Sequence, residues 1–172
     1  MALKPKHPKD SIAVITEFVL PNDTNTLGNL MGGRLLHWMD IAAAIAAHRH
    51  CGRIVVTASV NNVSFSQPIR LGEIVTMHAK VSRSFNSSME VYIDVWVENN
   101  TTVEKKKCNE AIYTFVAVDQ LGNPIGVPEL IPETDEEKKR FDGALRRRQL
   151  ALILAGKMKP HEATELKALF VG

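Results

Sequence analysis

Cysteine is scarce in this 172-residue chain, which contains only Cys51 and Cys108. Two cysteines are too few for a disulfide framework and are typical of ordinary thiols in a reducing compartment. Apolar runs of the roughly 18 residues that cross a membrane are missing, and the opening MALKPKHPKD lacks the apolar segment of a secretory signal. These absences predict a cytoplasmic protein without a membrane span.

Excess charge is missing as well, because the net charge is only +2. A dedicated nucleic-acid binder usually carries a basic excess, so we expect no nucleic-acid partner. The chain is 45% hydrophobic and 23% charged, which is typical of a soluble globular protein. Its length suits one domain with a short appendage better than two compact domains.

Several familiar site motifs are also absent. The chain contains no G-x-S-x-G elbow, no P-loop and no dinucleotide fingerprint, since GNLMGG lacks the required glycine spacing. His48, His50 and Cys51 do not share one face of a helix and have no matching second pair of ligands, so we expect no metal site. Histidines near the negative pole of a helix are the simpler interpretation.

The pattern of apolar residues predicts one long helix and five strands. Residues 12–20, IAVITEFVL, are rich in β-branched and aromatic types and predict a first strand. Dense apolar residues from Gly33 to His50 predict a helix that is covered on most sides and stops at Gly52. Four strand-like stretches follow with short links, over residues 54–65, 73–85, 88–100 and 105–119.

Short links between strands favour antiparallel pairing. In the stretch 88–100, apolar residues alternate with polar or aromatic ones, which is the period of a strand with one face on the core. The apolar positions are Met89, Val91, Ile93, Val95 and Val97. The order of elements therefore predicts an α+β architecture, in which a curved antiparallel β-sheet wraps around a long central helix.

The tail has a different composition and predicts a helical extension. The segment TDEEKKRFDGALRRRQLALIL opens with a capping box from Thr134 to Glu137 and carries alternating blocks of charge. Its acids nearly balance its bases, which favours a solvated helix over a nucleic-acid surface. We expect one domain over residues 1–131 and a C-terminal helical extension over residues 132–172.

Asp40 is the most informative residue, because it is a carboxylate within an otherwise apolar helix. Such an acid has to be hydrogen-bonded, paired or functional, since desolvating an ion is costly. It can act as a general base toward water or as a nucleophile. His37, one turn earlier, can contact it, although an ordinary polar position at the helix edge explains that residue equally well.

The loop before this helix adds three candidates. Gly32 and Gly33 lie at the predicted helix start, where free N–H groups and the positive dipole end favour an oxyanion. Asn25 can both donate to and accept from a water or a carbonyl. From the residues alone the alternative stays open that Asp23 and Asn25 are turn residues and that Asp40 satisfies a buried N–H.

Three stretches carry a resemblance to a known family: NDTNTLGNLMGGRLLHWMDIAAAIAAHRH, VTASVNNVSFSQPIRLGEIV and SSMEVYIDVWVE. Over residues 10–130 the chain resembles the hotdog-fold acyl-CoA thioesterases, in particular the cytosolic acyl-CoA hydrolases and their short bacterial relatives. The resemblance implies the hotdog fold and a catalytic pair at Asn25 and Asp40. It also implies that the helix start at Gly32 and Gly33 polarises the thioester carbonyl.

The same resemblance implies dimers whose sheets join edge to edge, assembled as a hexamer from a trimer of dimers. Each site would then take Asn25 from one subunit and Asp40 from the other. CoA also needs a cationic seat for its phosphates and an apolar slot for pantetheine and the acyl chain. The candidates are Arg83, Ser87, Ser88, Val56 and Thr57, with Lys105 to Lys107 as an alternative phosphate seat. Each of them could equally be a turn residue or a structural β position.

The function expected from this resemblance is hydrolysis of a fatty acyl-CoA to free fatty acid and CoA-SH. No cofactor or metal is expected, since CoA is part of the substrate. A non-catalytic acyl-CoA binding or sensing module of the same fold is the main alternative. Hydratases and dehydratases of the same fold have a sequence pattern that places a histidine and an acid together. His37 alone does not supply that pattern here.

Overall fold

The computed structural model describes residues 3–61, 63–65 and 67–170. The chain divides into two compact units, Met1–Ile131 and Pro132–Gly172, which are considered separately below. Within the described residues, no helix is both long enough and apolar enough to cross a membrane.

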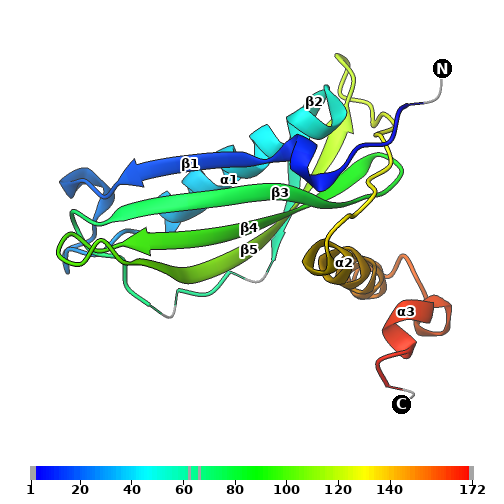
Figure 1. Ribbon diagram of the computed structural model, residues 1–172. Coiled ribbons are helices and arrows are strands. Elements are labelled where there is room, and N and C mark those ends of the chain that lie inside the picture. Colours follow the sequence, from blue (N-terminus) through cyan, green and yellow to red (C-terminus); the bar gives the residue numbers. More distant parts are fainter. Residues whose placement is uncertain (1–2, 62, 66, 171–172) are drawn as a thin grey trace. The chain divides into compact units, whose positions relative to one another are not determined.

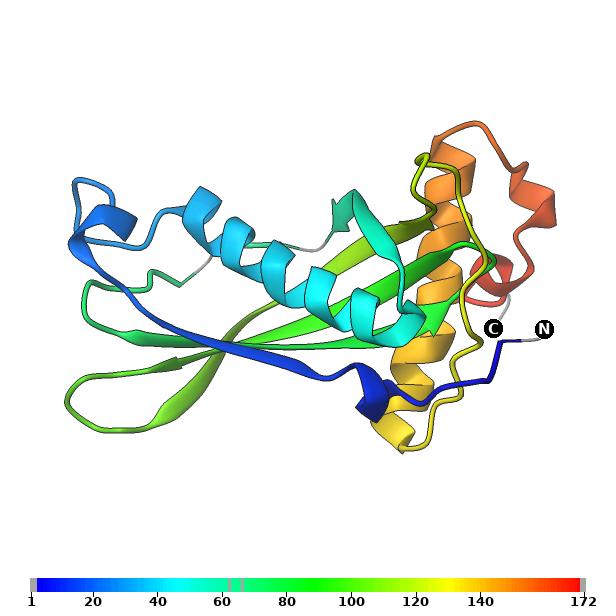
Figure 2. The same cartoon turned by 90° about the horizontal axis from the view of Figure 1, so that it is seen from above.

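The first unit contains a five-stranded sheet in the order β1-β3-β4-β5-β2, with every neighbouring pair antiparallel (Figure 1). The strands are β1 (Ala13–Phe18), β2 (Ile54–Asn61), β3 (Ile74–Ser84), β4 (Ser88–Glu98) and β5 (Lys105–Val118). The helix α1 (Gly32–Cys51) lies lengthwise along one face of this sheet (Figure 2). Two 3-10 turns, η1 (Pro8–Ser11) and η2 (Pro21–Asp23), flank β1. The predicted hotdog architecture is therefore confirmed.

The core lies between α1 and the sheet. Four alanines of α1 have no exposed surface, and their small side chains allow the helix to approach the strands closely. The predicted alternation in β4 is also confirmed. Met89, Val91, Ile93 and Val95 are fully buried, whereas Val97 at the end of the strand is half-buried.

One side of α1 is open in the single chain, which differs from the expectation that most sides of the helix are covered. His37, Ile41 and Ile45 form an exposed stripe at helical spacing. The edge strand β2 is also largely exposed. Its exposed apolar side chains are those of Ile54, Val56 and Val60. An apolar stripe beside an unpaired strand edge is typical of a surface that another chain covers.

The end of α1 follows the sequence prediction. Gly52 has a φ of 63°, in the left-handed region that glycine adopts without strain, and its N–H donates to the His48 carbonyl at 2.7 Å. The Lys6 ammonium donates to the Arg49 carbonyl at 2.8 Å. Both contacts satisfy carbonyls that the last helical turn leaves without a partner.

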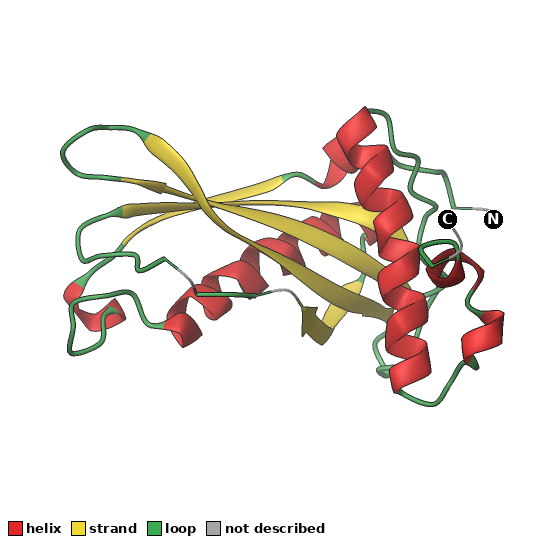
Figure 3. Ribbon diagram, turned by 90° about the horizontal axis from the view of Figure 1, so that it is seen from below, coloured by secondary structure: helices red, strands yellow, loops and turns green. Residues whose placement is uncertain are grey.

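The second unit contains the helix α2 (Asp135–Leu154), the 3-10 turn η3 (Pro160–Glu162) and the short helix α3 (Thr164–Lys167), drawn as helices in Figure 3. The predicted capping box at the start of α2 is confirmed. The Thr134 hydroxyl accepts from the Glu137 N–H at 3.2 Å, and the Glu137 carboxylate accepts from the Thr134 N–H at 3.1 Å. Gln149 joins α2 to α3 by accepting from two backbone N–H groups, each at 3.1 Å.

Candidate functional site

Asp40 lies on α1 and is half-buried. Its Oδ1 accepts a hydrogen bond of 2.7 Å from the Thr57 hydroxyl on β2. No other hydrogen bond joins the Asp40 carboxylate to a described residue, so Oδ2 is left open to a water or a substrate. Thr57 was predicted as part of a substrate slot, and in the structure its hydroxyl orients Asp40.

A β-bulge explains how Thr57 reaches the helix. The pairing of β2 with β5 shifts by one residue after Thr57, so that Thr57 lies opposite Phe115 and Val60 lies opposite Tyr113. Side chains directly opposite each other share a face of the sheet, and Phe115 and Tyr113 are both buried on the helix side. Thr57 and Val60 therefore face the helix together, although residues three apart in a regular strand point to opposite sides.

A hollow of about 680 Å³ opens beside Asp40. Gly33, Leu36, His37, Val60 and Tyr113 contribute to its wall. This volume and this mostly apolar lining with a few polar groups are typical of a small-molecule site.

Tyr113 was not identified from the sequence. Its hydroxyl donates to the Leu36 carbonyl at 3.0 Å. Burial, and then the negative charge of Asp40, raise the pKa of Tyr113 to about 12, so its hydroxyl stays a neutral donor. A tyrosine within a run of strand residues carries no sequence signal of such a position.

Asn25 lies at a second hollow, of about 330 Å³, which Gly32, Leu35, Phe65 and Ile69 also line. Its side-chain oxygen accepts from the backbone N–H groups of Leu27 at 3.0 Å and Asn29 at 3.2 Å. These bonds occupy the acceptor of the amide, whereas its Nδ2 has no partner among the described residues. Asn25 is therefore arranged as a hydrogen-bond donor.

Asp23 has a structural role in the same loop, which agrees with its interpretation as a turn residue. The carboxylate is buried, accepts from the Leu20 N–H at 3.0 Å and pairs with the Arg34 Nε at 3.0 Å. The Met31 N–H donates to the Asp23 carbonyl at 2.9 Å. These contacts attach the Asn25 loop to the first turn of α1.

The start of α1 is open, because the N-cap residue Met31 makes no side-chain cap. The first N–H groups of a helix have no partner within the helix, so those of Gly32 and Gly33 are available to a ligand. A Cβ on Gly32 would lie 3.3 Å from the Phe65 ring, whereas a Cβ on Gly33 would meet open space. The two glycines line different hollows, Gly32 beside Asn25 and Gly33 beside Asp40.

The four predicted catalytic residues therefore fall into two pairs within one chain. Asn25 and Gly32 form one half of the predicted set, and Gly33 and Asp40 form the other.

The residues predicted to contact the CoA phosphates, Arg83, Ser87 and Ser88, line neither hollow within one chain. Arg83 is near the end of β3, with its guanidinium carbon 5.7 Å from the centroid of the Phe85 ring. Ser87 and Ser88 lie at the β3–β4 turn, and Ser88 is buried. The Asn25 loop is attached near the opposite end of β3, because the Leu30 N–H donates to the Ile69 carbonyl at 2.7 Å. The exposed Val56 precedes Thr57 on the free edge of β2.

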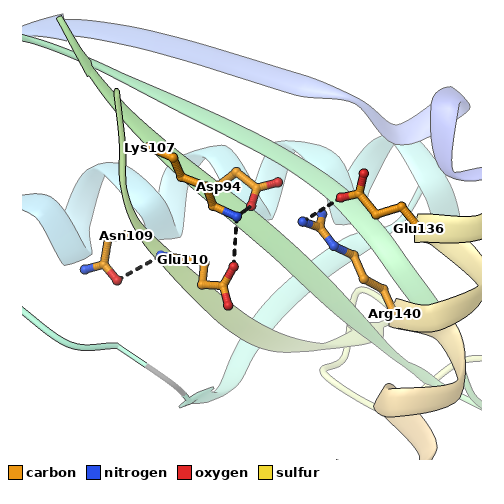
Figure 4. A network of polar contacts seen from close by, with 6 residues as sticks. All are labelled: Asp94, Lys107, Asn109, Glu110, Glu136 and Arg140. Carbon is orange, nitrogen blue, oxygen red and sulfur yellow. Dashed lines mark hydrogen bonds and ion pairs between the residues drawn. The ribbon is translucent and has the colours of Figure 1, made fainter. Parts of the chain in front are cut away.

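The alternative phosphate seat at Lys105 to Lys107 is partly neutralised. The Lys107 ammonium lies 2.6 Å from an Asp94 oxygen and 2.9 Å from a Glu110 oxygen (Figure 4). Burial lowers the pKa of Lys107, but the hydrogen bonds to these two carboxylates together raise it by more. The pKa of Lys107 is therefore above its ordinary value. Lys105 and Lys106 are exposed.

Neither cysteine is activated as a nucleophile. Burial raises the pKa of the Cys108 thiol to about 11 and also raises the pKa of Cys51. His48 contacts the Arg53 carbonyl at 2.9 Å, and His50 contacts the Pro128 carbonyl at 2.8 Å. Among the described residues, no three His, Cys, Asp or Glu side chains are grouped as metal ligands.

Comparison with known proteins gives consistent results. The model of the thioesterase superfamily matches residues 27–104. An uncharacterized acyl-CoA thioester hydrolase of Bacillus subtilis, YkhA, is 40% identical over 139 residues, which cover 81% of each chain. The cytosolic acyl coenzyme A thioester hydrolase of Rattus norvegicus is 37% identical over 74% of this chain, but the match spans only 34% of that longer protein.

Solved structures match both fold and sequence. An acyl-CoA hydrolase from Bacillus cereus has a TM-score of 0.85 and 34% identity, covering 96% of this chain and 98% of its own. A hexameric acyl-CoA thioesterase has a TM-score of 0.85 and 35% identity, covering 89% and 98%. The acyl-CoA hydrolase of Staphylococcus aureus, solved with butyryl coenzyme A, coenzyme A and coenzyme A disulfide, has a TM-score of 0.80 and 35% identity, covering 88% and 94%.

Proposed function

This chain belongs to the thioesterase superfamily, and from that premise we propose that it hydrolyses acyl-coenzyme A thioesters to a carboxylic acid and CoA-SH. The observation that carries the proposal is the Asp40 carboxylate, held by Thr57 at 2.7 Å, with its other oxygen open beside an apolar hollow. Fatty acyl-CoA is the proposed substrate class. The relatives are named as hydrolases, which favours catalysis over a binding or sensing module.

The proposed reaction uses a carboxylate, an amide and a helix start. A water attacks the thioester carbon and gives its proton to Asp40, or Asp40 itself attacks and the resulting anhydride is hydrolysed. The carbonyl oxygen becomes an oxyanion and accepts from the Asn25 amide and from N–H groups at Gly32 or Gly33. Collapse of the intermediate breaks the C–S bond. The departing sulfur becomes CoA-SH with the proton that Asp40 took from the water or, in the anhydride route, with a proton from the water that hydrolyses the anhydride. No metal or separate cofactor is assigned a role.

A complete site requires two chains in this proposal. The Asn25 half of one chain would meet the Asp40 half of another if two β2 edges paired, and this contact would also cover Ile41, Ile45 and Val60. We propose a hexamer built as a trimer of dimers, and a structural neighbour that is hexameric supports the number of subunits. Val56 would then border the pantetheine slot, and Arg83, Ser87 and Ser88 of a further subunit would contact the CoA phosphates.

The proposed setting is the cytoplasm, in fatty acid metabolism. A cytosolic relative and the reducing environment that suits two free thiols support this location.

Release of free thiol from a series of acyl-CoA lengths tests the proposal. We expect enzyme-dependent release with saturation kinetics for at least one chain length. Tight binding of every acyl-CoA without thiol release would contradict hydrolysis and favour the binding module.

A further inference from the structure

Tyr113 makes a polar contact with α1 that the reaction proposed above does not use. It is 1% exposed, on the helix-facing side of β5, and its hydroxyl donates to the Leu36 carbonyl at 3.0 Å. A buried tyrosine hydroxyl normally has a partner, but the choice of this partner has consequences for Asp40.

The Leu36 carbonyl is four residues before Asp40 in α1. In an α-helix this carbonyl is the acceptor for the Asp40 N–H, and a carbonyl oxygen has two lone pairs. Tyr113 and the Asp40 backbone therefore share one acceptor. The tyrosine fixes the turn of helix from which the Asp40 side chain projects.

The side chains that contact Asp40 and its helical turn lie on the same, helix-facing side of the sheet. Tyr113 lies opposite Val60 on β2, and the β-bulge puts Val60 and Thr57 on the same face. Thr57 holds the side chain of Asp40 at 2.7 Å, while Tyr113 holds the preceding turn of its helix. The strand β2 thus holds the Asp40 carboxylate directly through Thr57, and the neighbouring strand β5 holds the helical turn before it through Tyr113.

We propose that Tyr113 is a positioning residue that fixes the Asp40 carboxylate for thioester hydrolysis, a role that rests on the proposed function. Its hydroxyl acts on the turn of helix that carries Asp40 and does not touch the substrate. The ring contributes to the wall of the hollow beside Asp40 and stacks on Phe115, with centroids 6.2 Å apart. Misplacing a catalytic group costs turnover more than it costs substrate binding.

The test is Tyr113→Phe, which removes one oxygen and keeps the ring. We expect kcat to fall about 10-fold with KM nearly unchanged, since only the placement of the carboxylate is altered. Folding should persist, because the Leu36 carbonyl keeps its bond within the helix. The matched control is Tyr92→Phe on β4, whose side chain lies on the opposite face of the sheet from Met89 and Val91, and it should leave kcat at the wild-type value.

The same change in an Asp40→Asn background separates positioning from a structural role. If Tyr113 acts through Asp40, Tyr113→Phe should not lower the residual turnover of Asp40→Asn any further. An equal loss in both backgrounds, or an unchanged kcat in the single variant, would overturn the proposal. Should Tyr113→Phe unfold at the assay temperature, thermal midpoints allow both comparisons to be repeated at a temperature where it is folded. Failure of the hydrolase proposal itself would be recognised separately, as absence of thiol release by the wild-type protein.

Discussion

Asp40 is the one carboxylate from Leu35 to Ala47, and the contacts around it explain its presence in an apolar helix. The Thr57 hydroxyl occupies Oδ1, and the hollow lies beside it. By contrast, Asp23 has both oxygens engaged within its own loop and helix start. The two aspartates differ in that both oxygens of Asp23 have partners, whereas Asp40 has a hydrogen bond at one oxygen only among the described residues.

Asp40→Asn tests the chemistry of the carboxylate. The amide keeps the shape but lacks the negative charge and basicity, so we expect kcat to fall on the order of 10²-fold or more. The thermal midpoint should stay level or rise slightly, because an amide avoids the cost of desolvating an ion. Thiol release and thermal denaturation measure the two effects.

The control is Asp119→Asn, since Asp119 is a half-buried acid whose hydrogen bonds are to its own turn and which does not line the hollow beside Asp40. Its turnover should match the wild type. Near-normal turnover of Asp40→Asn together with a clearly lowered midpoint would mean that Asp40 is structural.

At the scale of elements, the sequence predicted those features of helices and strands that depend on residues close together in the chain. The alternation in β4, the stop of α1 at Gly52 and the capping box of α2 all follow from side-chain period or backbone chemistry within a few residues. The β-bulge after Thr57 could not be predicted, because it is a property of pairing with β5 and not of β2 alone. For the same reason neither the Thr57–Asp40 bond nor Tyr113 emerged from the sequence.

The candidate site shows the same limit. The residue pattern gave Asn25, Asp40 and the two glycines as candidates and the resemblance implied their catalytic roles, but neither predicted the separation of these residues into two hollows. That separation depends on which side of the helix start each glycine faces. The residues proposed for the CoA phosphates lie at the far end of β3 in one chain, so a second chain is needed to test their placement.

A buried histidine near the C-terminal end of α1, His50, should make the stability of the fold depend on pH. His50 is fully buried, its Nε2 donates to the Pro128 carbonyl, and its Nδ1 has no partner among the described residues. Burial lowers the pKa of His50 from its ordinary 6.5, and this is the largest effect. The Pro128 bond raises the pKa by less, and the charges of Lys6 and Asp10 lower and raise it by still smaller amounts, so the net shift is downward. The folded protein therefore holds this imidazole neutral.

As pH falls below 6.5, the unfolded chain takes up a proton at His50 more readily than the folded chain does. Stability should therefore decrease as the pH is lowered through this range. We expect that, as the pH is lowered, the thermal midpoint of His50→Gln falls less steeply than that of the wild type. His161→Gln, at an exposed position of the second unit, is the control and should keep the wild-type slope. Equal slopes for His50→Gln and wild type would contradict this explanation.

At the scale of the whole molecule, the single chain separates the predicted catalytic residues into two hollows and leaves apolar surface uncovered. The open stripe of α1 and the free edge of β2 lie next to the Asp40 hollow, so the same contact between chains would bury apolar surface and complete a site. Assembly and catalysis are thereby linked in this account.

Arg83→Ala tests whether the far end of β3 contributes to CoA binding in the assembly. A phosphate contact is distant from the reacting carbon and is equally strong in ground and transition states, so we expect KM to rise more than kcat falls. Arg83→Lys keeps the charge and should restore part of the affinity. An unchanged KM for Arg83→Ala would move the phosphate seat elsewhere, with Lys105 and Lys106 as the next residues to replace.

The central claim is that each site takes Asn25 from one chain and Asp40 from another, and mixing two inactive variants tests it most directly. Asn25→Ala and Asp40→Ala proteins are combined in equal amounts, subunits are exchanged, and thiol release is measured. Random pairing in two-fold dimers should restore about a quarter of wild-type activity, because half of the dimers are mixed and each mixed dimer has one intact site. No recovery after exchange has been verified by mass spectrometry would contradict the shared site.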